Sequence, residues 1–165
     1  MEIAESVLVP SARAARALAT AIKRASHVYL CGNGGSAANA IHLANDFISC
    51  GVRAHALSAD IATLTAIAND YSYDEVFSRQ VETLGTKDDL LIALSGSGSS
   101  INIWCAIEAA IGQKMSTWAI YGDFCHQQPI DFAPDKTVRK GKTMQEAEEY
   151  QLALGHKTMR CLKNS

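Results

Sequence analysis

The sequence lacks the features that would place it in several common classes of protein. Its five cysteines lie at positions 31, 50, 105, 125 and 161 with no C-x-x-C pair. Neither a disulfide framework nor a cysteine metal site is predicted, and a reducing cytoplasm is the expected compartment. The formal net charge of −2 gives no electrostatic reason to expect a nucleic-acid partner. No apolar run is long enough to span a membrane, and no signal-peptide pattern opens the chain, so no membrane partner is expected.

The length and composition are those of one ordinary globular domain. The 165 residues can bury a core, and 48% of them are hydrophobic and 19% charged. We expect a single domain over residues 1–165, with an N-terminal helix within 1–26, a sheet core over 27–140 and a C-terminal helix within 141–165.

A glycine-rich turn, residues 32–36, is the feature around which the rest of the chain is organised. We call it the glycine loop. An apolar run at 28–31 predicts a buried strand before it, and small and apolar residues return at helical spacing after Ser36. The first turn of a helix has unpaired N–H groups, and glycines let a ligand approach the backbone. The loop therefore predicts an anion site, to which Ser36 adds a hydroxyl donor.

A second turn of the same design, residues 95–100, reads Ser-Gly-Ser-Gly-Ser-Ser, and we call it the serine loop. It follows a strand-like run at 90–94 and precedes a helix from Ile101. Neither loop contains Lys or Arg, which excludes a P-loop and leaves hydroxyls and amides to hold a phosphate. Both loops could be simple tight turns, but two such loops at matching strand ends favour a site.

A dinucleotide site is the main rival interpretation of the glycine loop. Residues 32–37 also fit the pattern G-x-G-x-x-A. That fingerprint expects an acidic residue about 20 positions further on, at the end of the next strand. The candidate, Asp60, comes later and stands at an expected helix start. The serine loop would also remain unexplained, so we expect no nucleotide cofactor.

Strands and helices alternate along the chain, which predicts an α/β fold with a doubly wound parallel sheet and flanking terminal helices. Ligands bind such sheets beyond the carboxyl ends of the strands, where both loops lie. The expected strands are 28–31, 53–57, 90–94, 117–121 and a polar edge strand at 136–139, and the expected helices are 11–25, one after residue 36, 61–68, 74–84, 101–112 and 144–162.

Two pairs of polar residues on helices are candidates for chemistry. His42 and Asp46 are four apart and share one face of the helix that follows the glycine loop. Glu148 and His156 are eight apart on the final helix, a little over two turns. A surface ion pair would explain the first pair about as well, and a solvated face is the plain alternative for the charged residues of the final helix.

Three motifs in order resemble the sugar isomerase (SIS) domain family, and its phosphoheptose isomerase branch most closely. They are GNGGS-x-x-x-A-x-H from Gly32, TAIANDYSYDEVFSRQVE from Thr65 to Glu82, and SGSGSS from Ser95. The resemblance covers residues 28–118 and implies a flavodoxin-like sheet.

The resemblance also implies roles for individual residues. Asp46 and His156 would be the acid–base pair, and His42, Asp46, Glu148 and His156 would together hold one zinc ion. The chain departs from the family here, because Asp46 stands where the family has Glu, Glu148 where it has Gln, and Cys50 where it has Arg. The substrate and its phosphate would be bound by Asn33, Gly34, Ser36, Asp70, Ser95, Ser97 and Ser100.

The function implied is that of an isomerase converting sedoheptulose 7-phosphate into D-glycero-D-manno-heptose 7-phosphate, for heptose, lipopolysaccharide or capsule precursors. The family also implies a homotetramer whose last-helix residues complete a neighbour's site. One branch of the family binds without catalysis and assists the bacterial replication initiator, but it lacks the acidic residue and the final histidine. A phosphosugar-sensing regulatory domain is a third alternative.

Overall fold

The computed structural model describes residues 9–123 and 136–164, and within them a five-stranded parallel sheet forms the centre. The strand order is β2-β1-β3-β4-β5, with Val28 opposite both Ala54 and Leu90 in the register. The fold class is therefore confirmed, and the order is the flavodoxin-like one. The strands are β1 (Val28–Cys31), β2 (Ala54–Ala56), β3 (Leu90–Ser95), β4 (Ser116–Tyr121) and β5 (Lys136–Arg139).

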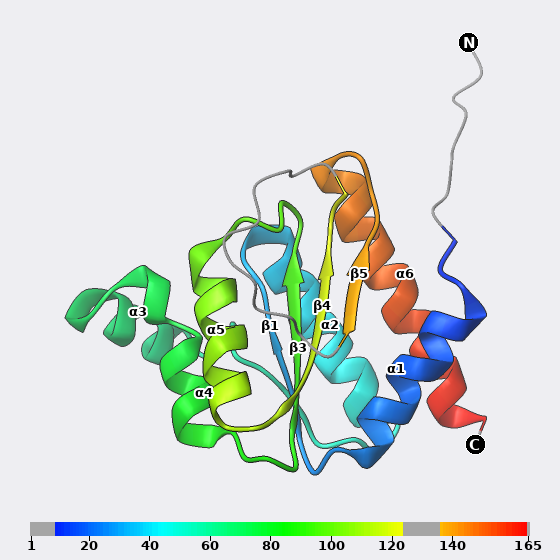
Figure 1. Ribbon diagram of the computed structural model, residues 1–165, viewed down its shortest axis with the longest axis horizontal. Helices are drawn as coiled ribbons and strands as arrows, with labels where there is room; N and C mark the ends of the chain where they lie inside the picture. Colours follow the sequence, from blue (N-terminus) through cyan, green and yellow to red (C-terminus); the bar gives the residue numbers. More distant parts are fainter. Residues whose placement is uncertain (1–8, 124–135, 165) are drawn as a thin grey trace.

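Helices cover both faces of the sheet, and each face has its own apolar core (Figure 1). One face carries α1 (Ala12–Arg24), α2 (Gly34–Ser49) and α6 (Met144–Lys163), whose apolar side chains pack around Leu30 and Ile92. The other face carries the 3₁₀ turn η1 (Tyr73–Glu75), α4 (Ser78–Leu84) and α5 (Ile101–Gly112) around Leu91. The strands β1 and β3 are buried on both faces, which explains their unbroken apolar sequence.

Side-chain caps fix the starts of three helices. Ser11 accepts a hydrogen bond from the N–H of Ala14 at α1, and Thr143 accepts one from Glu146 at α6. Asp60 accepts bonds from the N–H groups of Ala62 and Thr63 at α3 (Ile61–Asp70). The Thr63 hydroxyl also donates to it, and this bond, with the N–H bonds, holds the pKa of the Asp60 carboxyl below its usual value. A carboxylate used in this way leaves the dinucleotide pattern without its acidic partner.

Several element boundaries differ from those expected. Helix α2 begins at Gly34, inside the glycine loop, because Gly34 takes φ of +53° and the chain turns into the helix at once. Helix α3 continues to Asp70, and the 3₁₀ turn separates it from α4. The expected irregular segment after β4 lies mostly at residues 124–135, outside the described residues.

The topology brings the two loops together. Strands β1 and β3 are parallel neighbours, so the glycine loop after β1 and the serine loop after β3 leave the same edge of the sheet. Chain connections depart in opposite directions between these two strands, and such a switch point is where doubly wound sheets bind ligands. Among the described helices, none combines the length and hydropathy needed to cross a bilayer.

Candidate active site

The glycine loop presents backbone rather than side chains. Asn33 stands at the N-cap position of α2 but makes no capping hydrogen bond with its side chain. The Ser36 side chain is only 2% exposed, and its Oγ has no partner within residues 9–123 and 136–164. Gly34 and Gly35 add no side chains of their own, so N–H groups and one buried hydroxyl are what the loop itself offers an anion, and the Glu148 carboxylate of α6 lies over Gly35.

The serine loop is held in shape by its own polar atoms. The N–H of Gly98 donates to Ser95 Oγ at 2.9 Å, and Ser99 Oγ donates to Ser97 Oγ at 3.0 Å. Trp104 of α5 donates its ring N–H to the Gly98 carbonyl at 3.0 Å. Ser100 stands at the N-cap of α5 without a side-chain capping bond, so the start of this helix is also open to a ligand.

A short arm reaches the glycine loop from α3 and η1. The Tyr73 hydroxyl donates to Asn33 Oδ1 at 2.9 Å. Asp70, the other predicted contact from this arm, is exposed at the end of α3 and accepts a bond from Asn69. The predicted phosphate ligands on the two loops thus share one edge of the sheet, whereas Asp70 stays at its margin.

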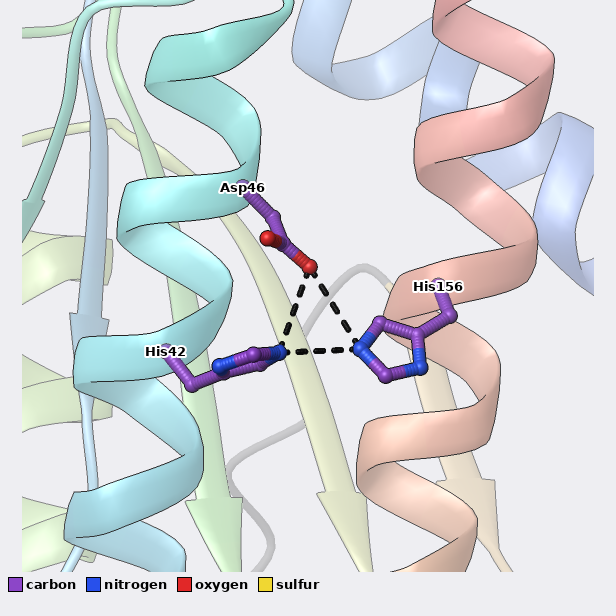
Figure 2. Close-up of side chains that lie close together, drawn as sticks. All are labelled: His42, Asp46 and His156. Carbon is purple, nitrogen blue, oxygen red and sulfur yellow. Dashed lines mark hydrogen bonds and ion pairs between the residues drawn. The ribbon is translucent and has the colours of Figure 1, made fainter.

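Further along α2, three side chains of the predicted acid–base and metal set converge on one point (Figure 2). The Nε2 atoms of His42 and His156 are 2.9 Å apart, and each lies 3.4 Å from Asp46 Oδ2. Asp46 is the least exposed of the three, with 18% of its side chain accessible. Two imidazole nitrogens and a carboxylate oxygen within 4.8 Å of one another can hold a cation or pass a proton.

This convergence depends on close packing between α2 and α6. A Cβ on Gly155 would collide with the Leu43 side chain, so the glycine lets the two helices approach at that level. Gln151 is fully buried, where it accepts a bond from Asn39 and donates one to the Ile120 carbonyl. Helix α6 is thereby fixed against α2, and His156 meets His42 within one chain.

Glu148 does not join the cluster. Its carboxylate lies directly over Gly35, where a side chain on that residue would begin. The metal-competent group within the described residues comprises His42, Asp46 and His156 alone. Eight residues separate Glu148 from His156, which is about 12 Å along the helix axis, so the predicted four-ligand set becomes three in this structure.

Sequence reasoning missed Asn102 and Tyr73, which both bond to Asn33. The SGSGSS motif ends just before Asn102, and no local pattern pairs that residue with a loop 69 positions earlier. Cys31, immediately before the glycine loop, is fully buried. Burial raises the pKa of its thiol to about 12, so it is no nucleophile at neutral pH.

The fold and the site define a doubly wound α/β protein with two glycine- and serine-rich loops paired at one edge of its sheet. The model of the SIS domain family matches residues 3–122, and the chain belongs to this family. A phosphoheptose isomerase from Alteromonas mediterranea is 43% identical over 129 residues, which are 73% of this chain and 65% of that protein. The match to a second phosphoheptose isomerase, from Halorhodospira halophila, is 46% identical but covers 59% of its length. The chain thus matches less than two thirds of the length of these relatives.

Solved structures show the same relationship. A phosphoheptose isomerase from Neisseria gonorrhoeae superposes with a TM-score of 0.80 at 32% identity, covering 93% of this chain and 84% of that one. A phosphoheptose isomerase from Francisella tularensis gives 0.85 at 28% identity, covering 93% and 86%. The resemblance inferred from the three motifs is therefore confirmed.

Proposed function

We propose that the protein is an aldose–ketose isomerase that converts sedoheptulose 7-phosphate into D-glycero-D-manno-heptose 7-phosphate. The observation that carries this proposal is that His156 of α6 meets His42 and Asp46 of α2, the helix that begins at the glycine loop. The names of the relatives support the substrate class. One end of the site suits a phosphate and the other suits proton transfer.

The isomerisation moves a proton between C1 and C2 of the sugar through an enediol. Asp46 and His156 are the acid–base pair in this proposal, since carboxylate and imidazole groups are the side chains that most often serve as general acids and bases. Their 3.4 Å contact would let one hold the other in position. The two loops hold the distant phosphate, so the reacting carbons lie near the pair.

A zinc ion fits the donor set. His42, Asp46 and His156 would hold it, and three protein ligands with an open position are typical of catalytic zinc. Such an ion would polarise the substrate oxygens during enolisation.

The competing functions fit this geometry less well. A non-catalytic phosphosugar-binding protein of the replication-initiator-associating type has no need for an acid and a histidine that meet between two helices. Asp46 and His156 do meet here, from α2 and α6. The same argument disfavours a phosphosugar sensor, for which the two loops alone would suffice.

We also propose a homotetramer with active sites at or near subunit contacts. Helix α3 has no buried residue, and it exposes 74% of Ile61 and 58% of the adjoining Tyr71. Tyr71 is two residues from Tyr73, whose hydroxyl contacts the glycine loop, so a neighbour that covers this end of α3 would border the site. His156 meets His42 within its own chain, so in this proposal the neighbour borders the site and need not supply that histidine.

The test is to incubate the purified protein with sedoheptulose 7-phosphate and follow the sugar by NMR. We expect the aldose phosphate to appear, whereas unphosphorylated sedoheptulose should remain unchanged because it has no phosphate for the loops to hold. Tight binding of sugar phosphates without conversion of any ketose phosphate would favour the binding protein instead.

A further inference from the structure

Two asparagine side chains join the starts of α2 and α5. Asn33 donates from Nδ2 to Asn102 Oδ1 at 2.8 Å, and Asn102 donates from Nδ2 to Asn33 Oδ1 at 2.9 Å. The Tyr73 hydroxyl donates to the same Asn33 oxygen, also at 2.9 Å. Asn102 is only 2% exposed and Asn33 is half-buried, so the pair is largely shielded from water. The pair connects the glycine loop to the first turn of the helix that follows the serine loop.

These bonds decide what Asn33 can do at its own helix. Asparagine is among the residues that cap helices best, by accepting a bond from the N–H two or three positions on. Asn33 has the extended backbone of an N-cap residue, with φ −111° and ψ 151°, yet its side chain caps nothing. An amide oxygen has two lone pairs, and Asn102 and Tyr73 occupy both. The side chain is therefore held away from the N–H groups of Gly35 and Ser36.

A second observation indicates that this helix start is built for a ligand. The Ser36 Oγ lies in the same turn, is buried, and lacks a partner within the described ranges 9–123 and 136–164. A buried hydroxyl without a hydrogen bond costs free energy unless a ligand or water meets it. Gly34 has φ of +53°, a conformation that turns successive N–H groups toward one side.

We propose that Asn102 is a positioning residue that keeps the α2 start open for a phosphoryl oxygen. It does so by holding Asn33 in a pair that prevents this side chain from capping α2, with Tyr73 completing the hold. The same pair fixes the starts of α2 and α5 beside each other, so that both helix dipoles favour one anion. This inference rests on the proposed function for the identity of the anion, a sugar phosphate.

The test uses inorganic phosphate, so it does not depend on isomerase activity. Tyr73→Phe removes one hydroxyl from an exposed ring, and Tyr71→Phe is its matched control, because Tyr71 is equally exposed and packs under Arg79 instead. Phosphate binding is followed by ³¹P NMR, and amide hydrogen exchange is measured at Gly35 and Ser36. We expect Tyr73→Phe to raise the phosphate Kd about threefold to tenfold, the value of one hydrogen bond, and Tyr71→Phe to leave it unchanged.

Asn102→Ala should have the larger effect. Freed from the pair, Asn33 would cap α2, so the amides of Gly35 and Ser36 should exchange more slowly and the phosphate Kd should rise by about tenfold or more. The double variant Asn33→Gly and Asn102→Ala also lacks the released Asn33 side chain. The amides of Gly35 and Ser36 should therefore exchange fast again. A purely structural loss would not show this reversal.

Two results would overturn the inference. One is a folded Asn102→Ala protein with wild-type amide exchange at Gly35 and Ser36. The other is a Tyr73→Phe protein that binds phosphate as wild type does, which stays informative even where Asn102→Ala does not fold. The protein could instead show the expected phosphate binding and amide exchange but no isomerase activity. That result would refute the proposed function and leave the positioning role of Asn102 supported.

Discussion

The two ends of the candidate site are built from different parts of the protein. At the sheet edge, the glycine and serine loops offer backbone N–H groups and hydroxyls, and no charged side chain belongs to either loop. Within α2 and α6, His42, Asp46 and His156 offer only titratable groups. In the proposed function, the first end holds the phosphate and the second transfers protons.

This difference assigns anchoring and chemistry to separate places on one helix. His42 and Asp46 follow Ser36 by six and ten residues, which is about 9 to 15 Å along α2 at the usual helical rise. A substrate must therefore be long enough to reach from the loops to the cluster, which a sugar of several carbons with a terminal phosphate is. Mutations at the two ends should consequently affect different kinetic constants.

The largest effect is expected from Asp46→Asn. An amide cannot take up a proton as the carboxylate does, so kcat for sedoheptulose 7-phosphate should fall by about 10²- to 10⁴-fold. KM should change little, because the phosphate anchor is intact. Asp88→Asn is the control, since Asp88 is exposed at the opposite edge of the sheet. Wild-type turnover by the Asp46→Asn protein would remove this residue from the chemistry.

A smaller effect of the opposite kind is expected at the serine loop. Ser97→Ala and Ser100→Ala should each raise KM about 10- to 150-fold, since a hydrogen bond to a charged group contributes roughly 1.5–3 kcal/mol. The value of kcat should be nearly preserved. Ser116→Ala, at the start of β4, serves as the control because it is exposed at the far edge. If both loop variants bind phosphosugar normally, the serine loop is only a turn.

Metal content should distinguish the cluster from Glu148. We expect near one zinc per chain in protein purified without chelator, a clear loss in His42→Ala, and no loss in Glu148→Gln, because Glu148 lies over Gly35. The glutamine should also bind phosphate slightly more tightly, since it removes a negative charge beside the glycine loop. Elemental analysis and phosphate titration measure both. Loss of zinc in Glu148→Gln would return that residue to the ligand set.

The smallest effect is expected from mixing two impaired variants, which should restore no activity. When Asp46→Asn and Ser97→Ala proteins are dissociated, mixed and reassembled, activity should stay at the mean of the two, because each site takes both residues from one chain. Light scattering should show a tetramer, and tagged subunits can verify that hybrids form. Recovery well above the mean would show that the two ends of one site come from different subunits.

The sequence predicts the glycine and serine loops better than the cluster of His42, Asp46 and His156, for a physical reason. Strand, glycine turn and helix are local, so Gly34 and Ser97 could be placed at a sheet edge from their neighbours alone. His156 reaches Asp46 because Gly155 leaves room for the Leu43 side chain between α6 and α2. His156 and Asp46 are more than a hundred positions apart in the sequence. Helical spacing predicts that Glu148 and His156 lie on neighbouring faces of α6. It does not predict that Glu148 lies at the glycine loop. Asn102 was missed because its partner, Asn33, lies 69 positions earlier in the sequence.

One substrate should span both ends of the site, from the two loops to the cluster of His42, Asp46 and His156. The distance from its phosphate to a metal at the cluster is the most direct test. This distance can be obtained from the ³¹P relaxation of sedoheptulose 7-phosphate bound to protein loaded with Mn²⁺, with His42→Ala as the unloaded reference. We expect the phosphorus and the metal to be on the order of 10 Å apart, from the helical rise between Ser36 and the cluster. A distance short enough for the phosphate to coordinate the metal would contradict it.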